Sequence, residues 1–135
     1  MAIDKQKLLN ALNESDPEVQ WFADLKLQNV RALSLKDPQG IERFRREMAA
    51  DAKRFVQIPK RTSRERYAEL EGFIKVVSDP ALQKRLREAL QSPSPQREFR
   101  LALERKAKEQ RQFEAYLQEC SLKRLREFQS LNYLG

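Results

Sequence analysis

The sequence of 135 residues contains no histidine and a single cysteine. Because histidine is the commonest general base and metal ligand, its absence excludes Ser-His and Cys-His nucleophilic pairs. The lone thiol, Cys120, excludes an internal disulfide and a paired-cysteine redox or metal motif. The three glycines, at positions 40, 72 and 135, are too scattered for a phosphate-binding loop. We therefore expect a protein that is not an enzyme and that has no cofactor and no metal site.

The sequence also has no long hydrophobic run and no signal-peptide pattern after Met1. A membrane-spanning helix needs about 20 consecutive apolar residues, so we expect a cytoplasmic protein with no membrane partner. Charged residues are abundant instead, at 35%, and the net charge is +7. Residues 41–135 carry the whole excess, with 22 Lys and Arg against 14 Asp and Glu. Such basic charge favours anionic partners, or it simply keeps the protein soluble.

The first 36 residues predict a short helix followed by a β-hairpin. Asp4 can cap a helix that extends to about Asn13. Apolar side chains then alternate over Val19–Leu27, which is typical of a strand, and a second strand follows over Val30–Leu35. Gln28-Asn29 offers the turn between them, although it lacks the usual glycine. A lone hairpin is marginally stable, so it must pack on helices or pair its edges with another chain.

From Asp37 onward the apolar residues recur with a helical period. A helix begins at Asp37-Pro38, and its apolar positions continue through Phe55 until Pro59 ends it. Thr62 and Glu65 then fit a capping box, in which each side chain accepts a hydrogen bond from the other residue's backbone N–H. This pattern predicts a second helix directly after residue 62.

The C-terminal region continues in helices. Asp79-Pro80 starts one of them, residues 92–95 form a proline-rich loop, and a helical pattern follows over 96–118. Whether 96–118 is one helix or two stays open, because Lys106–Arg111 contains no breaker and no apolar residue other than Ala107. A separate last helix carries Leu122, Leu125 and Phe128.

These elements predict an α+β fold in which a short N-terminal helix and a β-hairpin pack on a predominantly helical C-terminal bundle. The length favours a single domain over residues 1–135, with a helix-plus-hairpin half at 1–36 and a helical half at 37–135. We expect one continuous core, formed by Ile58, Tyr67, Phe73, Leu82 and Leu86.

Basic residues cluster at 43–66, a range that contains nine Lys and Arg but only three acidic residues. Arg61 and Arg64 fall near a helix N-terminus, where the helix dipole disfavours cations, so local helix stability would not select them. A phosphate or acidic group would benefit from such arginines and from free N–H groups together. Arg54, Arg61 and Arg64 are therefore the candidate anion-binding residues. The alternative is that the cluster is ordinary solvated surface, with long side chains covering apolar groups.

A central motif comprises Arg54-Phe55-x-x-Ile58-Pro59 and then Ser63, Tyr67, Leu70 and Phe73. It resembles the signature R-[YF]-x-x-I-P…S-x-x-x-Y-x-x-M-x-x-F of an uncharacterised bacterial protein family of unknown function. The resemblance covers about residues 19–130 and implies a hairpin half followed by a helical half. The chain departs from the family pattern at Leu70, where methionine is usual, and at Gln28, where glycine is usual. The resemblance implies no activity.

We therefore interpret the chain as a small non-enzymatic interaction or regulatory module whose partner is another protein. The alternative is a nucleic-acid-binding protein that uses the basic 43–66 region. An enzyme using Ser63, Tyr67 or Glu71 is a third and weaker interpretation. The edges of the hairpin also offer a route to a homo-oligomer.

Overall fold

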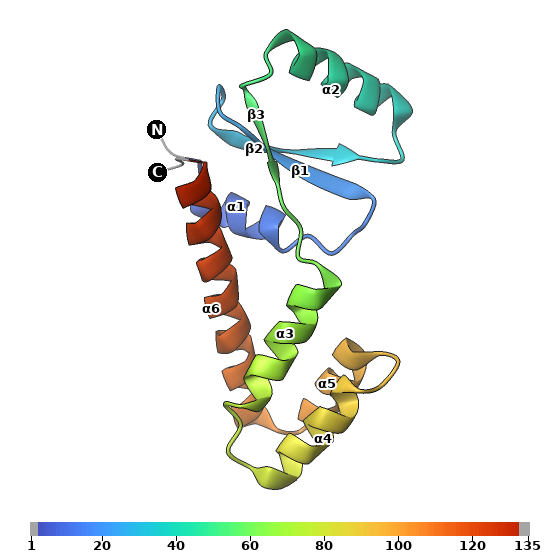
Figure 1. Cartoon of the computed structure of the whole chain (residues 1–135), viewed down its shortest axis with the longest axis vertical. Helices are drawn as coiled ribbons and strands as arrows, with labels where there is room; N and C mark the ends of the chain where they lie inside the picture. Colours follow the sequence, from blue (N-terminus) through green and yellow to red (C-terminus); the bar gives the residue numbers. More distant parts are fainter. Residues whose placement is uncertain (1–2, 133–135) are drawn as a thin grey trace. The chain divides into compact units, whose positions relative to one another are not determined.

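The computed structural model describes residues 3–132, and within them it contains six helices and one three-stranded sheet (Figure 1). In chain order these are α1 (Lys5–Leu12), β1 (Val19–Asp24), β2 (Asn29–Ser34), α2 (Pro38–Ala50), β3 (Phe55–Ile58), α3 (Ser63–Ile74), α4 (Pro80–Leu90), α5 (Pro95–Leu103) and α6 (Ala107–Leu131). The predicted α+β class, with an N-terminal helix and hairpin followed by a helical part, is confirmed.

The chain forms two compact units, which are described separately. The sheet unit comprises the described residues of 1–61 and 121–135, and the helical unit comprises Thr62–Cys120. Since two compact units are compatible with one domain or with two, the single domain over 1–135, with its halves at 1–36 and 37–135, stays a prediction.

The sheet has the order β2-β1-β3, and both pairs are antiparallel. In the hairpin, Asp24 lies opposite Asn29, so β1 ends three residues earlier than predicted and the loop is Leu25–Gln28. Within this loop the residue with a positive φ is Gln28, at 53°. Gln28 is the position at which the resembling family usually has glycine, the residue that adopts a positive φ without strain.

The third strand corrects the prediction that one helix extends from Asp37 to Pro59. The helix α2 ends at Ala50, and Phe55–Ile58 forms β3 beside β1. Met48 fits the apolar stripe of the predicted helix but is 36% exposed. The short segment Phe55–Ile58 fits either a helical or an alternating period. It forms a strand because its backbone N–H and C=O groups pair with those on the open side of β1.

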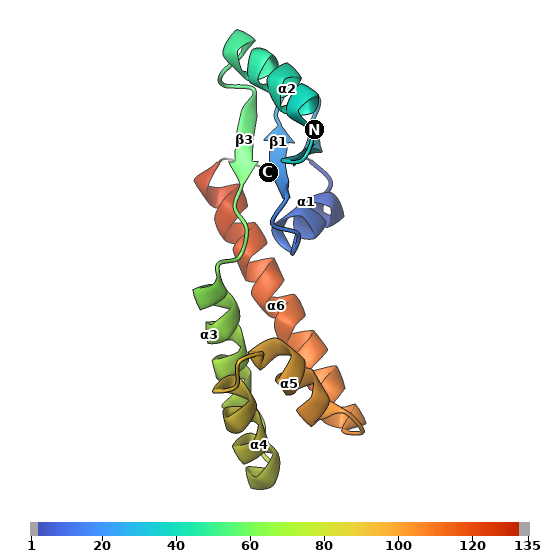
Figure 2. The same cartoon turned by 90° about the vertical axis from the view of Figure 1, so that its right-hand side faces the viewer.

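Alternation along the strands gives the sheet two different faces. One face packs against α1 and the end of α6, and its core includes Ala23, Ile58 and Leu125. The other face packs against α2 through a ring cluster in which the Phe44 ring centroid lies 4.6 Å from that of Phe22 and 4.8 Å from that of Phe55. Figure 2 shows α1 and α2 beside the strands from a second direction. The hairpin is therefore stabilised by a third strand and by helices on both faces.

The predicted helix starts are confirmed where local capping was recognised. The Asp4 side chain accepts a hydrogen bond from the Gln6 N–H, and Asp79 accepts one from the Ala81 N–H. The capping box of Thr62 and Glu65 is complete in both directions. These caps involve residues two or three positions apart, which explains why the sequence alone reveals them.

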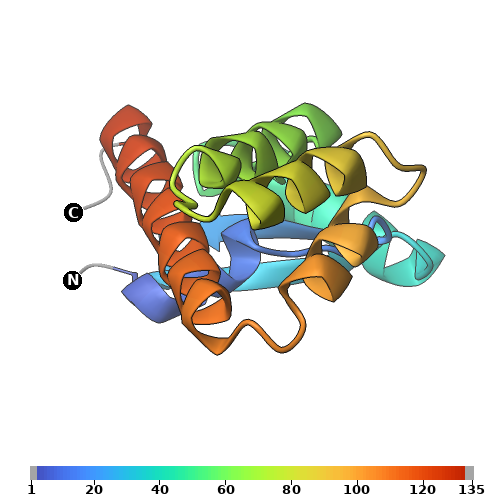
Figure 3. The same cartoon turned by 90° about the horizontal axis from the view of Figure 1, so that it is seen from below.

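The helical unit contains α3, α4, α5 and the first half of α6, and Figure 3 shows α3, α4 and α5 next to one another. At its centre Phe73 and Phe99 are fully buried. The ring of Phe113 lies 4.9 Å from that of Phe73 and 5.3 Å from that of Phe99. Side chains from three helices therefore share one aromatic core.

The region 96–118 contains parts of two helices, which resolves the open question. The break falls at Glu104–Lys106, where Arg105 has a φ of 65°. The predicted separate last helix is wrong, because α6 continues without interruption from Ala107 to Leu131. Polar residues on an exposed helix face do not interrupt it, so only the left-handed Arg105 separates the helices.

The expectation of one continuous core is also wrong. Ile58 belongs to the core of the sheet unit, whereas Phe73, Leu82 and Leu86 belong to the core of the helical unit. Tyr67 is 38% exposed and belongs to neither group of buried residues.

Candidate functional site

The helical unit carries a pocket of about 570 Å³ between one face of α3 and the first turn of α5. We call it the α3–α5 pocket. Four of its lining residues, Ser63, Arg66, Tyr67 and Leu70, come from α3, and Ser94–Arg97 supply the others. The α3 residues are spaced three and four positions apart and therefore share one face of the helix. The volume lies within the range of small-ligand sites.

Local sequence sets both walls of this pocket. The capping box at Thr62 starts α3, which makes Ser63 its first residue and turns Arg66 and Tyr67 to the same side. On the other wall, Pro95 occupies the first helical position of α5, and Ser94 precedes it as the N-cap residue. Unlike Thr62, Ser94 makes no capping hydrogen bond with its side chain. The Ser94 hydroxyl therefore remains available to a ligand.

The pocket wall is cationic. Arg66 and Arg97 line it, and no Asp or Glu is among its lining residues. The Nε atom of Arg66 is buried and has no hydrogen-bond partner within residues 3–132. A buried donor without a partner costs free energy, so an acceptor group in the pocket would be stabilised there.

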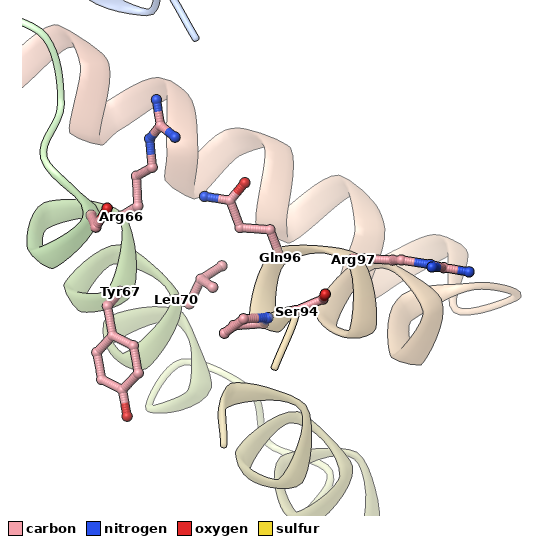
Figure 4. A pocket seen from close by; sticks show the side chains of 8 residues that line it. Arg66, Tyr67, Leu70, Ser94, Gln96 and Arg97 are labelled. Atoms are coloured by element: carbon pink, nitrogen blue, oxygen red, sulfur yellow. The ribbon is translucent and has the colours of Figure 1, made fainter. Parts of the chain in front are cut away.

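Figure 4 shows how these side chains lie. Arg66 and Arg97 leave different helices and extend away from each other, with Leu70 and Gln96 between them. Tyr67 is partly exposed, and its hydroxyl accepts a weak hydrogen bond from Gln91 Nε2 at 3.4 Å. The two positive groups therefore flank an apolar and amide surface and do not converge on one point.

A second hollow of about 430 Å³ lies between α5 and α6 of the helical unit. Its Arg100 is bound to Glu114 at 3.5 Å and lies over the ring of Phe113, with the guanidinium carbon 5.7 Å from the ring centroid. The Arg100 charge is thus already compensated by a carboxylate. For this reason we take the α3–α5 pocket as the candidate site.

Of the three predicted anion-binding residues, none lines the α3–α5 pocket. Arg54 belongs to the sheet unit, where its Nε and Nη2 atoms donate to Asp24 at 2.9 and 2.8 Å. Arg61 lies in the segment between β3 and α3, and Arg64 is exposed on the first turn of α3. Anion binding by these three arginines stays a prediction. The guanidinium group of Arg54 already forms an ion pair with the carboxylate of Asp24.

Two arginine–carboxylate pairs stabilise the face of the sheet that α2 covers. Asp24 is 3% exposed and also accepts hydrogen bonds from the backbone N–H groups of Lys26 and Leu27. Hydrogen bonding from Arg54 is the main reason why the pKa of Asp24 is lowered, although burial opposes it. Arg31 forms a two-point pair with Glu47, and these hydrogen bonds likewise lower the pKa of Glu47. Arg31 and Arg54 therefore stabilise the folded sheet unit through their ion pairs.

Other members of the basic 43–66 cluster also have acidic neighbours. Arg46 lies 3.4 Å from Glu42 on α2, and Arg43 lies 4.0 Å from Asp37. Both pairs are exposed and contribute little to stability, but each lowers the net positive charge of this surface.

Sequence reasoning identified Ser63 and Tyr67 as weak enzyme candidates and counted Arg66 within the basic cluster, but it missed Arg97 and Ser94. The spacing of Ser63, Arg66, Tyr67 and Leu70 signals a polar face on α3. No local pattern could indicate that this face meets the first turn of α5, because that contact joins segments about 30 residues apart. Glu71, the third enzyme candidate, does not line the pocket.

Within the part of the chain that the structure describes, no three His, Cys, Asp or Glu residues are grouped as metal ligands would be. No helix in that same part combines the length and the apolar character needed to cross a bilayer.

The chain is a small α+β protein whose helical unit carries a pocket lined by two arginines. The chain belongs to an uncharacterised protein family, UPF0158, whose family model matches residues 1–134. This confirms the resemblance inferred from the central motif. No curated protein matches the chain, and no solved structure matches it.

Proposed function

We propose that the protein is a non-enzymatic cytoplasmic interaction module and that its α3–α5 pocket binds a short acidic segment of a partner protein. The observation that carries this proposal is the charge of the pocket wall. Arg66 and Arg97 line it without any lining carboxylate to neutralise them. Asp or Glu side chains of a partner would form charge-assisted hydrogen bonds with both arginines.

A peptide segment suits the pocket better than a small anion does. Arg66 and Arg97 diverge, so one small anion would not bridge both guanidinium groups (Figure 4). Leu70, Pro95 and the ring of Tyr67 add apolar surface between them. A segment with two acidic side chains flanking an apolar residue would use all of these features.

The proposal of a non-enzymatic role rests on the chemistry of the lining residues. The pocket offers hydroxyl, amide and guanidinium groups, and histidine is absent from the whole sequence. Ser63 therefore has no imidazole to act as its general base. These groups are suited to binding.

Nucleic-acid binding through residues 43–66 remains the alternative. Its support is the surplus of exposed basic residues on α2, such as Arg45. The pairing of Arg43, Arg46 and Arg54 with acidic residues weakens it, because each paired carboxylate would compete with a phosphate.

An NMR titration of the ¹⁵N-labelled full chain tests the proposal. The probe is a capped Glu-Leu-Glu-Glu peptide, and the matched Gln-Leu-Gln-Gln peptide measures the contribution of charge. We expect the acidic peptide to shift the amide signals of Ser63, Arg66, Gln96 and Arg97, whereas the amide peptide should not. The double variant Arg66→Gln/Arg97→Gln should weaken binding by at least about tenfold, because hydrogen bonds to charged groups are lost.

The matched control is Lys84→Gln/Arg85→Gln, which removes the same charge from exposed positions on α4 outside the pocket. This control should leave the peptide affinity unchanged. Equal losses in both double variants would mean that net charge alone attracts the peptide, and the proposal would fail.

A labelled single-stranded oligonucleotide tests the alternative, nucleic-acid binding through residues 43–66. Tight binding with a steep salt dependence that Arg45→Gln/Arg46→Gln abolishes would favour nucleic acid.

A further inference from the structure

The strand order leaves β2 at one edge of the sheet, so one side of its backbone faces away from β1. In an antiparallel pair, alternate residues exchange hydrogen bonds with the partner strand while the others point outward. The Leu35 N–H donates to the Glu18 carbonyl at 2.7 Å, and this in-register bond fixes the alternation. It follows that Val30, Ala32 and Ser34 direct their N–H and C=O groups to the open side.

The structure confirms this direction at one end of the strand. The Ser34 carbonyl accepts a hydrogen bond from the Asp37 N–H at 3.2 Å, from outside the ladder. Within residues 3–132 no backbone hydrogen bond is formed by Val30 or Ala32 on the open side. Ala32 is also exposed, although it lies in the middle of the strand. The edge is therefore open where a further strand would bind.

Most features that normally protect an edge strand are missing from β2, and its one charged residue, Arg31, is paired with Glu47. It contains no proline and no lysine, and its pairing with β1 runs through six consecutive residues without a bulge. The opposite edge, β3, is only four residues long, whereas β2 has six residues. Of the two edges, β2 is thus the one that can accept another strand.

We propose that β2 pairs with β2 of a second copy of this chain, antiparallel and with Ala32 on the twofold axis, to form a continuous six-stranded sheet. In this register Val30 of each copy faces Ser34 of the other, and the outward groups of Ala32 bond to each other. Arg31 lies opposite Leu33 of the second copy, and its charge is already compensated by Glu47.

Competing registers are less favourable. If the axis passed through Arg31, the two arginines would lie directly opposite each other, which like charges disfavour. If it passed through Leu33, Val30 would face Lys36, which lies beyond the end of β2. The register centred on Ala32 keeps the strand residues paired with one another and places small side chains at the axis.

Exposed leucines at the two ends of β2 give independent support for a second copy. Leu27 in the hairpin loop is 66% exposed, and Leu35 after the strand is 39% exposed. Because the two strands are antiparallel, Leu35 of one copy lies next to the hairpin loop of the other, which carries Leu27. Pairing would therefore cover apolar surface at both ends of the new ladder.

Sedimentation velocity of the full chain over a range of concentrations tests the proposal, and we expect a monomer–dimer equilibrium. The variant Ala32→Lys places two ammonium groups at the axis and should raise the dimer Kd by at least about tenfold. Ala32→Pro removes only the outward N–H and leaves the ladder with β1 intact, so it should abolish the dimer without unfolding the sheet.

The matched control is Gln57→Lys, which adds the same charge to the exposed open side of β3. This variant should dimerise like the unmodified chain. A dimer that survives Ala32→Lys, or one that Gln57→Lys abolishes, would overturn the proposal, as would a monomer at all concentrations. Failure here would leave the proposed function of the α3–α5 pocket unaffected.

A crosslink gives a second readout that does not depend on dimer affinity. In a Cys120→Ser background, Ala32→Cys would place two thiols on a pair whose Cα atoms are about 5.5 Å apart, within disulfide reach. Mild oxidation should then yield a covalent dimer, whereas Gln57→Cys in the same background should remain monomeric. Equal crosslinking of both variants would indicate random collision and contradict the register.

Discussion

The hydroxyl of Tyr116 on α6 lies against Gly72 on α3, so close that a Cβ atom at position 72 would be 2.1 Å from the Tyr116 Oη. Glycine in a helix interior costs about 1 kcal/mol relative to alanine, so its presence in α3 needs a reason. The close approach supplies one, because only a residue without a side chain leaves room for the phenol. Burial raises the pKa of Tyr116, and the neighbouring Cys120 adds to this effect.

Gly72→Ala should therefore destabilise the helical unit by about 1–3 kcal/mol, although alanine is the better helix former. Helical circular dichroism in a urea titration measures the change. Adding Tyr116→Phe removes the clashing oxygen and should recover part of the loss. On the exposed side of α3, Ala68→Gly provides the control for helix propensity alone. A stabilised Gly72→Ala variant would show that Tyr116 does not occupy this space.

The pair of Asp24 and Arg54 makes the stability of the sheet unit depend on pH. Hydrogen bonds from Arg54 hold the pKa of Asp24 below its ordinary value in the folded protein. The stabilisation is therefore fully present above the unfolded-state pKa of about 3.9 and is lost as the pH falls through the lower folded-state pKa. Asp24→Asn should cost about 2–3 kcal/mol at pH 7, and this difference should shrink towards pH 2.

Fluorescence of Trp21, the single tryptophan, reports unfolding of the sheet unit in this experiment. The exposed carboxylate Glu127 on the last turns of α6 provides the control through Glu127→Gln. A cost of Asp24→Asn that stayed constant between pH 7 and pH 2 would contradict the role of the Asp24 charge.

The capping box at the start of α3 should be measurable by itself. Thr62→Ala removes the oxygen that accepts from the Glu65 N–H at 3.0 Å and should destabilise the helical unit by about 0.5–2 kcal/mol. Thr62→Ser keeps the acceptor and should remain close to the unmodified chain. If both variants melted like the original, the N-terminus of α3 would not depend on this cap.

Gln28 in the hairpin loop has a positive φ of 53°, a region that favours glycine. Gln28→Gly removes this strain but also removes the side-chain hydrogen bond to the Leu25 carbonyl, so we expect a small change in stability. Gln28→Val cannot relieve the strain, and it should be less stable than Gln28→Gly by about 1–2 kcal/mol. Trp21 fluorescence in urea compares the two, and equal stability would mean that the loop changes its conformation.

The sequence by itself determined the features that depend on near neighbours. The caps at Asp4 and Thr62 are satisfied within three residues, and the alternation over Val19–Asp24 is a property of one strand. The absence of histidine likewise excludes Ser-His and Cys-His nucleophilic pairs without any knowledge of the structure. Local hydrogen bonding and hydrophobic period fix such features before any distant segment is in place.

The tertiary structure alone decided where segments with two compatible conformations would go. Phe55–Ile58 fits a helical or an alternating pattern, and it became β3 because the open side of β1 offered backbone groups to pair. The same holds for the α3–α5 pocket, whose walls come from segments that only the packed core of the helical unit brings together. Pairing and packing between distant residues carry no local signature, so these features become visible only in the folded chain.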